Sequence, residues 1–123
     1  MNKYAKAAII AAQTLKTRNP MDAWQFAVQE IFPQSEESRK KSCPKNAFLG
    51  LCEEGIIKNS EPGNYSKSID NKNYAISAIN ILKQETGITT KNELWRLVTE
   101  GNNKKHNSQM DVVLALWNNN LIR

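Results

Sequence analysis

The stretch AFLGLCEEGIIK at Ala47–Lys58 decides the fold, because its pattern returns as VVLALWNNNLIR at Val112–Arg123. Apolar, polar and basic residues follow one another in the same order in the two stretches. The matched pairs are Leu49 with Leu114, Leu51 with Leu116, Ile57 with Ile122, and Lys58 with Arg123. We therefore predict an internal duplication, with repeat units over about residues 1–58 and 71–123 and a linker over residues 59–70.

The ends of the two stretches support this alignment. Gly55 in the first stretch aligns with Asn120 in the second. Glycine and, after it, asparagine most readily take the left-handed backbone angles that end a helix. The agreement concerns backbone shape rather than residue identity, and it predicts a helix end at each position.

Apolar residues recur at helical spacing in most of the chain. The predicted helices cover about residues 2–16, 20–32, 44–54, 71–84, 91–100 and 109–119. Asn19-Pro20 is typical of a helix start, and Thr90-Lys91-Asn92-Glu93 has the spacing of a capping box. Strand signals are confined to Ile56-Ile57 and Leu121-Ile122, which can pair as short extended tails. The sequence thus predicts an all-α single domain over residues 1–123, made of two packed three-helix repeats with negligible strand.

Size and composition narrow the class of protein. A chain of 123 residues is long enough to bury one hydrophobic core. Its content of 40% hydrophobic and 24% charged residues is ordinary for a globular domain. No apolar run approaches the roughly 20 residues of a membrane span, and Ala7–Ala12 is shorter than a signal-peptide core. Cys43 and Cys52 have no metal-binding spacing. We expect a cytoplasmic protein with free thiols, no membrane contact, no metal and no cofactor.

Two basic clusters are the main functional candidates in a chain of net charge +5. Each precedes a predicted helix, and unpaired N–H groups at a helix N-terminus attract anions. The predicted anion-binding residues are Arg39, Lys40, Lys41 and Lys45 around a start capped by Cys43, and Lys104, Lys105 and His106 before a start capped by Ser108. They predict a non-enzymatic binding module for nucleic acid or another anionic partner. The competing interpretation is that these lysines lie in solvated loops and only keep the protein soluble.

Two further functions compete with this one. A protein–protein adaptor would use exposed helix faces or the segment 59–70. A thiol-dependent enzyme would use Cys43, whose pKa should fall beside cations at a helix N-terminus, with His106 as the base. No third member of a catalytic triad is identifiable, so we expect no enzymatic activity. We also do not expect the third helix to read DNA bases directly, because that helix is largely apolar and carries Glu53 and Glu54.

Three segments carry a resemblance to a known family. They are SRKKSCPKNAFLGLCEEG at Ser38–Gly55, NKNYAISAINIL at Asn71–Leu82 and HNSQMDVVLALWNNNLI at His106–Ile122. Together they resemble a bacterial family of small proteins defined by a domain of unknown function. The resemblance spans nearly the whole chain and implies a bacterial, cytoplasmic, single-domain protein. It implies no activity, cofactor or catalytic residue.

Overall fold

The computed structural model of the chain describes residues 1–85, 87–88 and 90–123. Its helices are α1 (Lys3–Gln13), α2 (Pro20–Ile31), α3 (Glu36–Arg39), α4 (Ser42–Glu53), α5 (Ile69–Gln84), α6 (Lys91–Val98) and α7 (Gln109–Asn118). Within the described ranges, α3 is a single turn and every other helix has at least eight residues. The only extended pairing there is an isolated bridge between Ile57 and Ile122. The all-α prediction is confirmed.

Polar side chains fix the starts of most helices. A side-chain oxygen just before the helix accepts a hydrogen bond from a first-turn N–H, which otherwise has no partner. Asn2, Asn19, Ser35, Ser68 and Thr90 do this for α1, α2, α3, α5 and α6. Pro20 takes the first position of α2, so the predicted start at Asn19-Pro20 is confirmed.

The predicted caps of α4 and α7 are wrong. Helix α4 begins one residue before Cys43, and the preceding Lys41 makes no side-chain cap bond. A thiol is a weak hydrogen-bond acceptor, so a cap position at Cys43 would gain little. Ser108 does precede α7, but its backbone is left-handed (φ 69°) and its side chain makes no cap bond. His106 replaces it, because its Nε2 accepts from the N–H of Met110 at 3.0 Å.

The C-terminal ends of α4 and α7 share one geometry. Gly55 and Asn120 both have left-handed backbones, with φ of 67° and 58°. After each, an N–H reaches back to the carbonyl five residues earlier, at 3.0 Å in both cases, which is the bond that closes a Schellman-type helix end. The two bonds are Ile56 to Leu51 and Leu121 to Leu116. Both helix ends predicted from sequence are therefore confirmed.

The two tails that follow these helix ends pair with each other. Ile57 lies opposite Ile122 in an antiparallel bridge. The N–H of Lys58 donates to Leu121 O at 2.9 Å, and the N–H of Arg123 donates to Ile56 O at 2.8 Å. The pairing predicted for the tails is confirmed, and the bridged residues Ile57 and Ile122 are a matched pair of the sequence alignment. The internal duplication itself stays a prediction.

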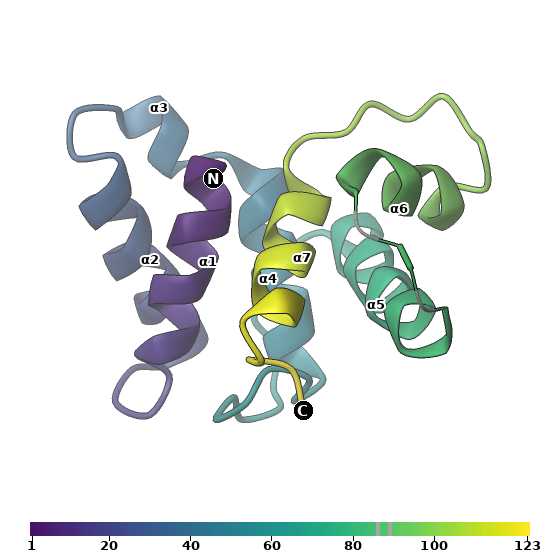
Figure 1. The fold of residues 1–123 in the computed structure, drawn as a ribbon. Helices are drawn as coiled ribbons and strands as arrows, with labels where there is room; N and C mark the ends of the chain where they lie inside the picture. Colours follow the sequence, from purple (N-terminus) through teal and green to yellow (C-terminus); the bar gives the residue numbers. More distant parts are fainter. Residues whose placement is uncertain (86, 89) are drawn as a thin grey trace.

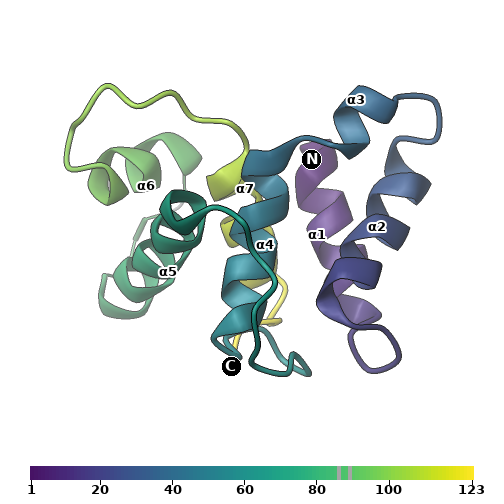
Figure 2. The same ribbon diagram turned by 180° about the vertical axis from the view of Figure 1, so that it is seen from behind.

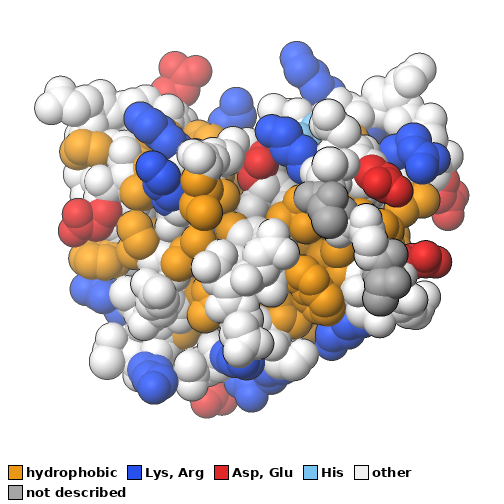
Figure 3. Space-filling model, in the orientation of Figure 1, with side chains coloured by type: hydrophobic (Ala, Val, Ile, Leu, Met, Phe, Trp, Pro, Cys, Tyr) orange, Lys and Arg blue, Asp and Glu red, His pale blue; other side chains and the backbone are white. Residues whose placement is uncertain are grey.

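Helices α4 and α7 lie in the centre of the molecule, with α1 and α2 on one side and α5 and α6 on the other (Figures 1 and 2). Helix α1 packs on α2 and α7, whereas α5 packs on α4, α6 and α7. Each predicted unit thus places its first helix against the last helix of the other unit. Buried apolar residues from both units form one cluster, which includes Trp24, Phe48, Leu94 and Leu116. Apolar side chains also reach the surface on either side of α7 (Figure 3).

The contact between α4 and α5 requires a glycine. A Cβ atom at position 50 would lie 2.7 Å from the Cα and Cβ of Lys72, closer than atoms of two packed helices can approach. Gly50 therefore lets the two helix backbones come together at this point. The chain between α4 and α5 runs back along α4. The close contact between these two helices therefore also fixes the path of that connecting segment.

We predict that Gly50→Ala destabilises the protein by about 1–3 kcal/mol through overpacking, although alanine is the better helix former. Urea unfolding measures the loss. The control Asn80→Ala replaces an exposed residue of α5 and should change stability by less than about 0.5 kcal/mol. A Gly50→Ala variant as stable as the parent would show that the α4–α5 contact is not as close as described.

Candidate functional site

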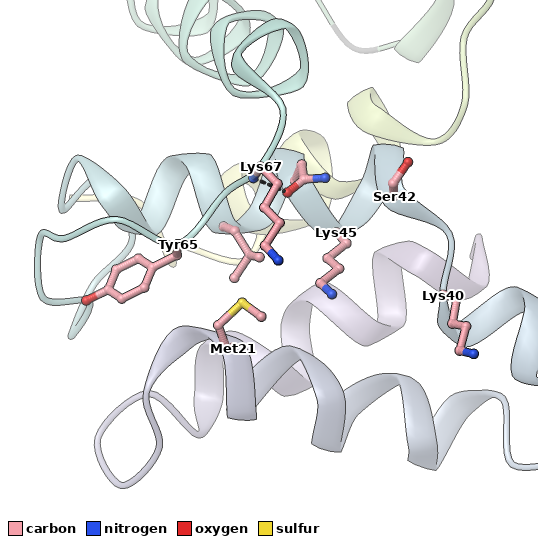
Figure 4. A pocket seen from close by; sticks show the side chains of 8 residues that line it. Met21, Lys40, Ser42, Lys45, Tyr65 and Lys67 are labelled. Carbon is pink, nitrogen blue, oxygen red and sulfur yellow. Dashed lines mark hydrogen bonds between the residues drawn. The ribbon is translucent and has the colours of Figure 1, made fainter.

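A hollow of about 190 Å³ lies beside the first half of α4 (Figure 4). Helix α2 borders it on one side, and the segment that leads from α4 to α5 borders it on the other. We call it the lysine pocket, defined by its lining residues Met21, Lys40, Ser42, Lys45, Asn46, Leu49, Tyr65 and Lys67. Three of these side chains are cationic, and Met21 and Leu49 give the hollow an apolar part.

Two of the lysines enter the pocket from different elements. Lys45 comes from the first half of α4 and Lys67 from the segment before α5, and in Figure 4 both side chains extend toward Met21. Among the described residues, neither ammonium group lies within 4.0 Å of a carboxylate oxygen. Two ammonium groups that share a hollow without a carboxylate partner create a local positive potential that attracts anions.

Lys67 reaches the pocket because side chains of α4 hold the preceding residues in place. We call residues 61–67 the strap. The carboxylate Oε1 of Glu53 accepts hydrogen bonds from the N–H groups of Tyr65 and Ser66, each at 2.6 Å. Asn46 Oδ1 accepts from the N–H of Lys67 at 2.9 Å. Asn46 and Glu53 are seven residues apart and so share one face of α4. The segment predicted as a linker is thus fixed along this helix.

Glu53 is nearly buried, and its hydrogen-bond and ion-pair partners explain how it can stay charged there. Its side chain is only 7% exposed, and Oε2 lies 2.7 Å from Nζ of Lys72. Burial alone would raise the pKa of Glu53, but the hydrogen bonds from Lys72, Ser66 and Tyr65 outweigh it and hold this pKa below its ordinary value. The ionised form is therefore the one that holds the strap to α4.

The other residues of the first basic cluster have different roles. Arg39 Nη1 donates to the carbonyl oxygens of Phe32 and Pro33, at 2.7 and 3.1 Å, and so closes the C-terminal end of α2. Lys40 lines the edge of the lysine pocket, but its ammonium lies 2.6 Å from Glu36 one helical turn away. Lys41 is exposed at the start of α4. Of the four predicted anion-binding residues, Lys45 is the one whose charge is directed into the hollow.

The second basic cluster is arranged differently. His106 accepts from the N–H of Met110, and its ring packs edge-on against Trp95 at 5.1 Å between ring centres. Trp95 Nε1 in turn donates to Lys104 O at 2.9 Å. The ring of His106 therefore occupies the N-terminus of α7, where an anion would otherwise bind. The side chains of Lys104 and Lys105 are exposed. None of the four predicted residues, including Ser108, lines the lysine pocket.

The imidazole of His106 is held in its neutral form. Burial lowers its pKa, and the nearby Lys91 lowers it further, while Asp111 acts in the opposite direction. The net effect is a pKa below the ordinary 6.5. A neutral ring is also what the contact with Met110 requires, because a protonated Nε2 cannot accept a hydrogen bond.

The structure does not assemble a thiol active site from the predicted pair. Cys43 is half-buried in the first turn of α4, and no hydrogen bond in the described part of the chain joins it to His106. Cys52 is buried in the core, and burial raises its pKa far above the ordinary value. Across the described ranges, no three potential metal-ligating side chains gather. No helix there has the length and apolar character of a membrane span.

We predict that His106, the single histidine, titrates below pH 6.5 in the folded protein. Since folding favours the neutral ring, His106 contributes stability above the ordinary pKa, and this contribution is lost as pH falls through that value toward the lowered one. The amide signal of Met110 should shift with the same midpoint in an NMR pH titration. A His106 pKa at or above 6.5, or a Met110 signal that ignores it, would contradict the assigned cap.

We predict that Glu53→Gln destabilises the protein by about 1–2 kcal/mol at pH 7, because the ion pair with Lys72 is lost. The lowered pKa means that Glu53 stabilises the fold above its ordinary value and ceases to do so as pH falls through the lowered one. The difference between variant and parent in urea unfolding should therefore shrink toward pH 3. Glu54→Gln, which removes the exposed partner of Lys72, is the control and should cost less than about 0.5 kcal/mol. Equal losses in the two variants would refute this assignment.

Comparison with known protein families supports the resemblance to a family defined by a domain of unknown function. Neither the curated proteins nor the solved structures include a match to this chain. A family match covers residues 1–123 of the chain. The chain therefore belongs to the family described as "Family of unknown function (DUF6979)".

Proposed function

We propose that the chain is a non-enzymatic module that binds the phosphate groups of a nucleic acid at the lysine pocket. The observation that carries the proposal is the convergence of Lys45 and Lys67 on one hollow without a carboxylate partner among the described residues. A phosphate oxygen is a strong acceptor for ammonium donors. The ligand would supply the negative charge that the protein does not provide there.

The surroundings of the pocket favour the same ligand. Ser42 offers a hydroxyl group at the first position of α4, where unpaired N–H groups add positive potential. Lys41 is exposed just before this position and extends the positive surface beyond the hollow. A partner with several phosphates in a row can use both places, whereas a single anion can use only one. Net charge +5 favours such a polyanion through long-range attraction.

The proposal assigns no reaction to the pocket. Its lining offers ammonium, hydroxyl and amide groups, which bind and orient an anion, and neither Cys43 nor His106 lines it. It places the module in a bacterial cytoplasm, where Cys43 and Cys52 would stay as free thiols. The second candidate function is a protein–protein adaptor, which the partly exposed apolar side chains of Ile81 on α5 and Val98 on α6 favour.

We predict that Lys45→Gln and Lys67→Gln each weaken binding of single-stranded RNA or duplex DNA, and each lower the salt dependence of log Kd by about one unit. The cause is the loss of one ammonium–phosphate contact and of the counterion that this contact releases. Fluorescence anisotropy at low and moderate salt measures the affinity. NMR amide shifts on residues 41–46 and 65–67 locate the contact, and plain phosphate serves as the small-ligand comparison.

Lys83→Gln is the matched control, because it removes the same charge from α5 and does not line the lysine pocket. It should leave affinity within about twofold, as expected for a charge outside the contact. Equal losses in all three variants would show attraction by total charge alone. The absence of salt-sensitive shifts at low salt would sink the proposal.

A further inference from the structure

Helices α5 and α6 enclose a groove that the proposed function does not use. Two hollows lie between them, of about 410 and 260 Å³, and they share Ile81 and Leu97. Ile88 lines the larger hollow and Val98 the smaller one. All four apolar side chains are partly exposed. We call this the α5–α6 groove. In Figures 1 and 2, α5 and α6 form the outer part of the second half, away from α1 and α2.

The rim of the groove is acidic. Glu85 and Glu93 line the larger hollow, and Glu100 lines the smaller one. Among the described residues, none of these carboxylates has a lysine or arginine nitrogen within 4.0 Å. Arg96 lies between them in the sequence, but it is exposed and lines neither hollow. A negative rim on a chain of net charge +5 is the opposite of what a phosphate ligand requires.

The groove has the spacing of a helix-binding surface. On α5 its lining residues are Ser77, Asn80, Ile81 and Gln84, which share one face of the helix. The two hollows therefore follow each other along α5, on either side of Ile81. Apolar side chains one or two turns apart on a second helix have the spacing needed to enter both hollows. Basic residues flanking that apolar stripe would meet the three carboxylates.

We propose that the α5–α6 groove binds a basic amphipathic helix of a partner protein. Apolar side chains of the partner fill the two hollows, and its lysine or arginine side chains pair with Glu85, Glu93 and Glu100. This site is separate from the lysine pocket in residues and in charge, so it stands or falls independently of nucleic-acid binding. Together the two sites would let the chain link a nucleic acid to a basic protein.

Three labelled peptides of about 14 residues, each about 21 Å long as a helix, test the proposal. The first has leucine at helical spacing with lysine elsewhere. The second carries glutamate in place of lysine, and the third is a shuffled leucine–lysine sequence without an apolar stripe. We expect the first alone to bind, with NMR amide shifts confined to the groove. Binding by the shuffled peptide at equal affinity, or shifts spread over the whole surface, would overturn the proposal.

Variants test the groove and its acidic rim. Ser77→Arg places a long cationic side chain at an exposed position of the groove, and it should weaken peptide binding about tenfold or more. Gln13→Arg adds the same residue at the exposed end of α1 and should leave the affinity unchanged. The double variant Glu85→Gln, Glu93→Gln should weaken binding and remove most of its salt dependence. Circular dichroism checks that each variant is folded.

One outcome would assign the groove to a different occupant. If the groove signals shift with protein concentration in the absence of peptide, a second copy of this chain covers the groove, and the proposal is overturned. Loss of RNA or DNA binding in Lys45→Gln with peptide binding intact would show that the two sites act separately.

Discussion

The rest of the structure depends on one constraint: the first helix of each half packs on the last helix of the other half. Helix α1 packs on α7, and α5 packs on α4, so that each half covers the last helix of the other. The paired tails at Ile57 and Ile122 join the ends of α4 and α7. Among the described residues, buried apolar side chains from both halves belong to one shared cluster. The side chains on the surfaces of α4 and α5 are therefore positioned by helices of both halves.

The lysine pocket follows from the path that the chain must take after α4. To reach α5, residues 61–67 run back along α4, where Asn46 and Glu53 accept their backbone N–H groups. Partly buried N–H groups need partners, and these two side chains supply them. The same contacts bring Lys67 to the hollow that Lys45 lines. A buried carboxylate whose role is structural thus sets the position of a lysine whose role is binding.

The starts of α4 and α7 show how two corresponding positions have different uses. At α7 the ring of His106 occupies the N-terminus, and Trp95 holds the preceding loop through Lys104 O. At α4 the side chain of Lys41 makes no cap bond, and Lys45 and Ser42 border an open hollow. The sequence predicted an anion site at both basic clusters, because charge is visible in a sequence. Which nitrogen atoms already have a hydrogen-bond partner is not. Lys67 gave no signal at all, since it lies in a polar segment with no periodicity.

The sequence by itself determined the features that depend on neighbours within one helical turn. The start at Asn19-Pro20 and the left-handed ends at Gly55 and Asn120 are local, because backbone angles and first-turn N–H groups act over three to five residues. Only the tertiary structure decided which distant groups meet. Asn46 and Lys67, 21 residues apart, come together because α4 packs on α5 and the chain between them has one path. Helical periodicity predicts which face of a helix is buried, but it carries no information about the partner that covers it.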